Sequence, residues 1–160
     1  MTDLPYRLNV GAALFNAAGR VFVGRRADLP PDMAHVWQLP QGGIDEGEDP
    51  RAAVLRELAE EIGTADADII GEHPDLLQYD LPPHLVGRAF GGRYRGQRQR
   101  WFALRFRGED ADIRLDAHVH PEFTAWRWAD LAELPSLAVD FKRPIYEIVA
   151  QAFSIYVTNK

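Results

Sequence analysis

The stretch that decides the fold runs from Gly42 to Thr64 and reads GGIDEGEDPRAAVLRELAEEIGT. It holds the pattern G-x5-E-x7-R-E-L-x-E-E-x-G, whose fixed positions are Gly42, Glu48, Arg56, Glu57, Leu58, Glu60, Glu61 and Gly63. A helix would bring Glu57, Glu60 and Glu61 into one stripe, because they are spaced i, i+3 and i+4. Like charges at that spacing repel by about 0.2–0.5 kcal/mol per pair, and a hard divalent cation with oxygen ligands removes the repulsion. The stretch therefore predicts a helix that carries a carboxylate site for a metal ion.

A solvated acidic face is the ordinary interpretation of three such glutamates taken alone. The full spacing argues against it, because eight fixed positions in a 22-residue window rarely coincide by chance on a properly capped helix. Asp49 suits an N-cap, Pro50 suits the first helical position, and Gly63 suits a left-handed end. The apolar residues that recur at helical spacing and are expected to face a core are Ala52, Val54, Leu55, Leu58 and Ile62.

Length and composition indicate one globular domain over residues 1–160, since 46% of the residues are hydrophobic and 26% are charged. The chain has no cysteine, which excludes disulfides and thiolate metal sites and agrees with a reducing cytoplasm. Neither a signal peptide nor an apolar run of about 20 residues is apparent. A net charge of −6 argues against a broad basic surface for nucleic acid. We expect a cytoplasmic protein without a membrane span.

Basic residues are concentrated between Leu81 and Gly108, where no acidic residue occurs. Seven of the 18 Lys and Arg residues lie there, namely Arg88, Arg93, Arg95, Arg98, Arg100, Arg105 and Arg107. The stretch is either a solvated hairpin or, beside a carboxylate site, a cradle for phosphate, because the planar fork of arginine matches phosphate oxygens.

The rest of the chain predicts strands and a second helix. Strands are expected at residues 8–15, 21–24, 37–39, 100–107 and 123–128, and around 69–70 and 79. Residues 16–20 form a turn and 27–34 a loop that contains Pro30-Pro31, while 131–134 form a helical turn. Residues 144–153 form an amphipathic helix whose apolar side holds Ile145, Ile148, Val149 and Phe153. Helices at two places among mixed strands suggest a sheet that is covered on both faces.

The complete pattern resembles the signature of the Nudix hydrolases; Thr64, where that family prefers an aliphatic residue, is the one departure. The resemblance implies an α+β fold, an α/β/α sandwich around a mixed β-sheet. Six further segments resemble one branch of the family, the bacterial RNA pyrophosphohydrolases and the plant-type dinucleoside polyphosphate hydrolases. They are YRLNVG (6–11), WQLPQGGID (37–45), YDLPP (79–83), GQRQRWF (96–102), HPEFTAWRW (120–128) and FKRPIY (141–146). Leu8 replaces a frequent Pro and Leu39 a variable Met or Phe.

The resemblance implies hydrolysis of a phosphoanhydride by water with Mg²⁺ or Mn²⁺ as cofactor. It assigns the metal to Glu57 and Glu61, with Glu60 completing the cluster. Glu122 would ligate metal or assist the water, although it could also be a surface turn residue. The backbone carbonyl near Gly42 is a further expected ligand. Arg56 and Glu48 would orient the glutamates, and which glutamate is the general base stays open.

The resemblance also implies substrate contacts. The polyphosphate is expected to meet Arg7, Arg25 or Arg26, Gln41, Gln97, Arg98 and Lys142, with Arg143 as a further contributor. Tyr79 and Phe141 would stack on a nucleobase, or else serve as core or rim aromatics. The four tryptophans, Trp37, Trp101, Trp126 and Trp128, are assigned mainly to core packing.

The expected reaction removes pyrophosphate from the triphosphorylated 5′ end of RNA. The alternative is hydrolysis of a dinucleoside polyphosphate, which the same motifs would serve. Hydrolysis of another nucleoside diphosphate derivative is disfavoured by GQRQRWF and FKRPIY. A non-catalytic binding module should have lost one of the glutamates in the pattern, and none is missing. The expected partner is accordingly an RNA 5′ end or a dinucleoside polyphosphate.

Overall fold

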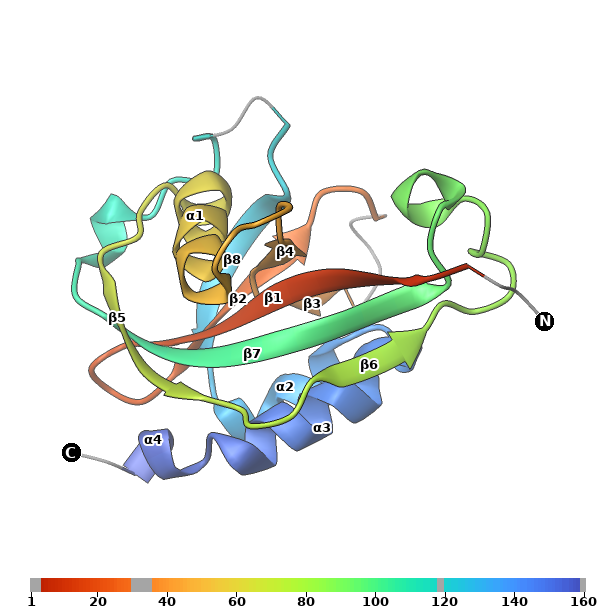
Figure 1. The fold of residues 1–160 in the computed structure, drawn as a ribbon. Coiled ribbons are helices and arrows are strands. Elements are labelled where there is room, and N and C mark those ends of the chain that lie inside the picture. Colours follow the sequence, from red (N-terminus) through yellow and green to blue (C-terminus); the bar gives the residue numbers. More distant parts are fainter. Residues whose placement is uncertain (1–3, 30–35, 118–119, 159–160) are drawn as a thin grey trace.

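A mixed sheet is the centre of the computed structural model, which describes residues 4–29, 36–117 and 120–158 (Figure 1). Its strands in the described residues are β1 (Tyr6–Phe15), β2 (Val21–Arg26), β3 (Trp37–Gln38), β4 (Gln41–Gly43), β5 (Ala67–Glu72), β6 (Leu77–Asp80), β7 (Gly96–Phe106) and β8 (Phe123–Ala129). The expected loop at Pro30-Pro31 lies outside the described residues.

The sheet has the order β3-β2-β1-β7-β5, and β4, β6 and β8 pair with β1, β7 and β2. β1 and β7 run parallel, in register from Tyr6 beside Gly96 to Phe15 beside Arg105. The other pairs are antiparallel. The mixed sheet expected from the sequence is confirmed.

Helices cover both faces of this sheet. α1 (Pro50–Ile62) lies on one face, and α2 (Leu134–Leu137) and α3 (Arg143–Ala152) lie on the other (Figure 1). The chain continues into α4 (Ile155–Thr158), and short 3-10 turns occur at η1 (Ala89–Gly92), η2 (Asp110–Asp112), η3 (Leu131–Glu133) and η4 (Asp140–Lys142). This arrangement confirms the α+β class and the α/β/α sandwich. No helix within the described ranges is long and apolar enough to cross a membrane.

The ends of α1 form as the sequence predicts. The Asp49 side chain accepts a hydrogen bond from the Ala52 backbone N–H at 3.2 Å, which satisfies one of the free donors of the first turn. Gly63 ends the helix in the left-handed region, at φ 79°. The expectation that Ala52 faces the core is wrong: Ala52 is exposed and Ala53 is buried in its place.

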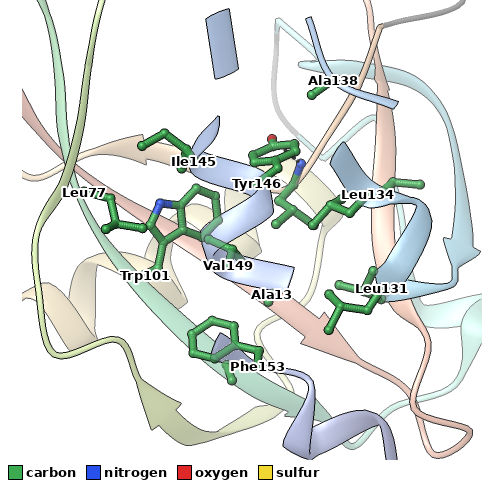
Figure 2. Close-up of a cluster of buried hydrophobic side chains, with 14 of the residues drawn as sticks. Ala13, Leu77, Trp101, Leu131, Leu134, Ala138, Ile145, Tyr146, Val149 and Phe153 are labelled. Atoms are coloured by element: carbon green, nitrogen blue, oxygen red, sulfur yellow. Dashed lines mark hydrogen bonds between the residues drawn. The ribbon is translucent and has the colours of Figure 1, made fainter. Parts of the chain in front are cut away.

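Side chains alternate along β1, so the sheet serves two cores. Val10, Ala12 and Leu14 pack with α1. The opposite face packs against α3, as Figure 2 shows for Trp101 beside Tyr146 and Val149. Figure 2 also shows, in the same cluster, Ala13, Leu131, Leu134, Ile145 and Phe153. Ile148 was expected on the apolar side of this helix, but it is 42% exposed.

Three further details differ from the sequence prediction. β4 forms where a loop was expected, because its three residues pair with β1 through the backbone and have no alternating pattern of their own. β7 begins at Gly96, four residues before the expected start at Arg100. Of the tryptophans, only Trp101 is fully buried; Trp37, Trp126 and Trp128 are half-buried and border the cores.

Candidate functional site

The turns of α1 beside β4 carry the acidic stripe, in which Glu61 is buried and Glu57 and Glu60 are half-buried. Glu57, Glu60 and Glu61 line a cavity of about 140 Å³ together with His120 and Glu122, which come from the segment just before β8. Residues more than 50 positions apart in the sequence thus meet at one cavity. The structure therefore brings the four glutamates predicted as metal ligands to one place.

Arg56 organises the glutamates around it. Its Nε and Nη2 donate to the Glu48 carboxylate at 2.8 and 2.9 Å, a two-pronged contact. Its Nη1 donates to Glu57 at 2.9 Å and to Glu60 at 3.3 Å, and Nη2 also donates to the Gly43 carbonyl at 2.8 Å. The Arg56 guanidinium lowers the pKa of Glu48 to about 2. Arg56 thereby ties α1 to the loop before it and to β4.

Glu57 and Glu61 form a hydrogen-bonded pair under the rim of the cavity. Burial raises the pKa of both carboxyls, and for Glu61 the effect is large, since Glu57 and Glu122 add repulsion. The backbone N–H of Gln41 donates to Glu61 and opposes this shift. Two carboxyls held this close together are suited to share a cation.

β4 lies close enough to α1 to leave no room for a side chain at Gly42. A Cβ built there would lie 1.9 Å from the Glu57 carboxyl carbon. Glycine is needed at this position because the strand and the carboxylate approach so closely. The same contact places the backbone around Gly42, where a carbonyl ligand was predicted, next to the predicted ligand Glu57.

A second cavity, of about 320 Å³, adjoins the glutamates and adds positive charge. Arg7, Arg26 and Lys142 line it together with the carboxylates of Asp28, Glu57, Glu61 and Glu122. Arg26 is paired with Asp28 at 2.6 Å. Arg7 is held in place because its Nη1 donates to Gln97 Oε1 at 3.0 Å and its guanidinium lies 5.1 Å from the centre of the Phe90 ring. Cations facing carboxylates across one cavity suit a polyphosphate with a bound metal ion.

Lys142 is the buried cation of this cavity, at 7% exposure. Its Nζ donates to Gln38 Oε1 at 3.1 Å. Burial, together with nearby Arg26, lowers the pKa of Lys142 to about 7. The ammonium therefore gains most from an anion brought into the cavity.

An apolar pocket of about 400 Å³ lies beside the cationic cavity and shares Arg26, Asp28, Phe90 and Lys142 with it. Tyr79 and Phe141 form one wall, with ring centres 5.5 Å apart. Tyr79 is buried and its hydroxyl accepts from Gln97 Nε2 at 2.6 Å, whereas Phe141 is half-buried. The pocket has the size and aromatic lining that a nucleobase needs.

Four of the residues predicted to contact phosphate do not line the cavity of about 320 Å³ that holds Arg7, Arg26 and Lys142. Gln97 is fully buried behind it and supports Arg7 and Tyr79. Arg98 donates to Gln78 Oε1 and covers the Tyr6 ring on another surface. Arg25 and the exposed Arg143 do not line it. For Arg98 the geometry does not support direct contact with phosphate, because strand alternation turns its side chain away from Gln97.

Five residues of the cavity had no role in the sequence prediction, namely Asn9, Asp28, Gln38, Gly43 and Phe90. Asn9 had a signal: it interrupts the apolar run of β1 between Leu8 and Val10. Phe90 had none, because the connection between β6 and β7 reaches the cavity only through tertiary structure. Gln38 had no signal either, because it stands out only through its hydrogen bond with Lys142, which is 104 residues away in the sequence.

The donor set fits a divalent metal ion. All of the side chains that line the carboxylate cavity offer oxygen except His120, and oxygen donors suit Mg²⁺ or Mn²⁺. Oε1 of Glu61 is buried and has no hydrogen-bond partner within the described part of the chain. In the same part, no three acidic or histidine side chains already surround a common point.

Comparison with known proteins places this site in a family context. The NUDIX domain family matches residues 5–149. A protein named RNA pyrophosphohydrolase from Acidiphilium cryptum is 65% identical over 153 residues, which are 96% of this chain and 93% of that protein. Proteins of the same name from Gluconacetobacter diazotrophicus and Rhodospirillum rubrum are 62% and 59% identical, over 95% and 91% of this chain and 93% and 86% of theirs.

Solved structures share the architecture at low sequence identity. Escherichia coli dihydroneopterin triphosphate pyrophosphohydrolase superposes with a TM-score of 0.66 at 22% identity, covering 92% of this chain and 99% of that one. A Caenorhabditis elegans Ap4A hydrolase complex superposes with a TM-score of 0.63 at 18% identity, covering 93% and 97%. At this identity the likeness establishes the fold alone.

Proposed function

This chain belongs to the Nudix family, and on that premise we propose that it removes pyrophosphate from the triphosphorylated 5′ end of RNA. The observation that carries the substrate is the 65% identity, over nearly all of both chains, to a protein named RNA pyrophosphohydrolase. Structural neighbours with other substrates share only the fold. We further propose that residues 1–160 act as one Nudix domain.

The reaction adds the oxygen of one water molecule to a phosphorus atom and breaks the phosphoanhydride bond, so that pyrophosphate leaves. Members of the family generally use divalent metal ions. We assign Mg²⁺ or Mn²⁺ to Glu57, Glu60, Glu61 and Glu122 with the carbonyl near Gly42, where it would neutralise charge on the phosphate oxygens. Arg56 keeps the glutamates in position through its contacts with Glu57 and Glu60.

The remaining residues of the cationic cavity and of the adjoining apolar pocket bind and orient the substrate. Arg7, Arg26 and Lys142 hold the polyphosphate across from the glutamates. Phe141 and Tyr79 receive a base of the RNA in the adjoining pocket. Because the two cavities share Arg26 and Lys142, one nucleotide can occupy both.

The test compares kcat/KM for a triphosphorylated oligoribonucleotide and for diadenosine tetraphosphate, with Mg²⁺ or Mn²⁺. The expected result is release of pyrophosphate from the RNA with the higher kcat/KM, and no release in excess chelator. A preference for diadenosine tetraphosphate would support the alternative, a dinucleoside polyphosphate hydrolase. Undiminished activity in chelator would contradict the metal site.

A further inference from the structure

Three buried amide and indole groups form a continuous hydrogen-bonded chain beneath the cationic cavity. Trp101 Nε1 donates to Gln99 Oε1 at 3.1 Å. Gln99 Nε2 then donates to Asn9 Oδ1 at 2.9 Å and to Gln41 Oε1 at 3.1 Å. Trp101, Gln99 and Asn9 are each at most 1% exposed. The parallel register places Asn9 directly beside Gln99, which is why the two side chains meet.

Trp101 fixes which group donates and which accepts in every hydrogen bond of this network. An indole N–H can only donate, so the oxygen of Gln99 has to face it. The Gln99 amide then has its two N–H bonds directed at Asn9 and Gln41. Rotating either of those amides by 180° would set a nitrogen donor against a nitrogen donor. Asn9 and Gln41 therefore both use their oxygen inside the chain and keep their nitrogen for the cavity.

Asn9 Nδ2 is the atom at the end of this hydrogen-bond network that is left without a partner in the described part of the chain. It is buried and has no hydrogen-bond acceptor within the described residues, while Asn9 lines the cavity that holds Arg7, Arg26 and Lys142. A buried amide donor without an acceptor is unfavourable and uncommon in native proteins. A group that is kept in this state by a fixed network is a candidate for contact with a ligand.

We propose that Asn9 binds substrate, with its Nδ2 donating to a phosphate oxygen of the polyphosphate, and that Gln99 and Trp101 are positioning residues that hold it in the donating orientation. This assignment rests on the proposed function for the identity of the anion. Phosphate with a bound metal ion is favoured because three cations and four carboxylates line the same cavity, and because phosphate oxygens accept without donating. A buried structural water is the competing occupant.

The first test is Asn9→Asp, which keeps the oxygen that Gln99 needs and turns the free donor into an acceptor. It should lower kcat/KM for triphosphorylated RNA by at least about 10- to 100-fold, the loss expected for a hydrogen bond to a charged group. Asn16→Asp is the matched control. Asn16 also uses its oxygen, accepting from the backbone N–H of Ala18 and Arg20, and it lies outside the cavity. Its activity should be unchanged.

The second test observes Asn9 directly in the wild-type protein. The side-chain NH₂ signals of Asn9 in a ¹⁵N correlation spectrum are those lost in Asn9→Asp. They should shift in a saturable way when inorganic pyrophosphate and Mg²⁺ are added, whereas the NH₂ signals of Asn16 should not. If Asn9→Asp folds poorly, the same signals are assigned in the wild type through bonds from the Asn9 backbone, so the measurement does not depend on the variant.

The third test changes a positioning residue. In Gln99→Glu, one carboxylate oxygen still accepts from Trp101, and the other faces the oxygens of Asn9 and Gln41. Both amides should turn and donate to Glu, which withdraws their nitrogens from the cavity. The NH₂ signals of Asn9 should then move before any ligand is added, and pyrophosphate should no longer shift them.

The outcomes separate this inference from the proposed function. If the wild type cleaves diadenosine tetraphosphate instead of RNA, the proposed function fails, and the Asn9→Asp comparison is made on that substrate. If Asn9→Asp folds and matches the wild type on the preferred substrate, or if the Asn9 signals ignore pyrophosphate, Asn9 holds a structural water only and the inference is overturned.

Discussion

Glu57 and Glu61 carry the strongest expectation at the scale of single residues. We expect Glu57→Gln and Glu61→Gln each to lower kcat by about 10²–10⁴-fold, because a lost metal ligand removes several kcal/mol of transition-state stabilisation. The fold should persist, since glutamine keeps the shape and Glu61 is already driven toward its neutral form by burial. Kinetics at saturating Mg²⁺ and a thermal melt measure the two effects. A variant with near-normal kcat would lose its assignment as a ligand.

Lys142 shows how a binding residue can oppose stability. We expect Lys142→Met to raise the free energy of unfolding by about 1–2 kcal/mol near pH 7, because it removes a buried charge at the expense of the Gln38 hydrogen bond. In a protein of this size that is a rise in Tm of about 2–8 °C. The value of kcat/KM should fall, since the polyphosphate loses a cation. A Lys142→Arg control keeps the charge and should not gain stability.

The stability that Lys142→Met gains over the wild type should depend on pH in a definite direction. The pKa of Lys142 is lowered to about 7 in the folded protein from an ordinary 10.5. Between these values the unfolded chain binds the proton and the folded protein does not, so the wild type gains stability as pH rises. The difference in Tm between Lys142→Met and the wild type should therefore be largest at or below pH 7 and shrink toward pH 10. A constant difference would mean that Lys142 stays charged when buried.

At the scale of elements, the site depends on how closely β4 approaches α1 and β1. Gly42 and Gly43 are neighbours whose missing side chains would point to opposite sides. A Cβ at Gly42 would meet the Glu57 carboxyl, and one at Gly43 would lie 2.6 Å from Arg7 Nη2. We expect Gly42→Ala to lower kcat by displacing a metal ligand. Gly43→Ala should mainly raise KM, because Arg7 can shift at the far end of a flexible side chain.

The two alanine variants control for each other, since each adds one methyl group to the same short strand. Steady-state kinetics at several Mg²⁺ concentrations should show that only Gly42→Ala alters the metal requirement. Equal effects on kcat from both variants would contradict the view that the two faces of β4 serve metal and phosphate separately.

Elements differ in how far the sequence predicts them. α1 was predictable to its ends, because the cap at Asp49, the stop at Gly63 and the glutamate spacing are local properties. β4 was not, since its pairing with β1 depends on residues 30 to 34 positions away and glycine gives no strand pattern. Ile148 was placed wrongly because helical period alone does not tell how wide the covered stripe is.

The same limit applies to the candidate site. The resemblance to a family located the glutamates, Arg7, Arg26 and Lys142, and the structure brings them to adjoining cavities. It could not show that Arg98 turns away from its neighbour Gln97, nor that Asn9 has a free donor. These properties arise from strand alternation and from contacts between residues about 90 positions apart.

At the scale of the whole molecule, the carboxylate cavity, the cationic cavity and the apolar pocket together connect opposite layers of the sandwich. The glutamates come from α1 on one face of the sheet, and Phe141 and Lys142 come from η4, which leads into α3 on the other. The cationic cavity lies between them, where β4 leaves the main order of strands. A substrate that reaches from base to terminal phosphate therefore contacts both layers.

Phe141→Ala tests this division between base and phosphate. If the ring stacks on a base, its loss should cost about 1–3 kcal/mol of binding, which is about 5- to 150-fold in kcat/KM for triphosphorylated RNA. The value of kcat should largely persist, because Arg7 and the glutamates line the cationic cavity and not the pocket that holds Phe141. Inhibition by inorganic pyrophosphate, which has no base, should be unchanged and serves as the control. A fall in kcat with unchanged KM, or a loss of pyrophosphate inhibition, would show that Phe141 supports Tyr79 and Lys142 structurally and does not stack on a base.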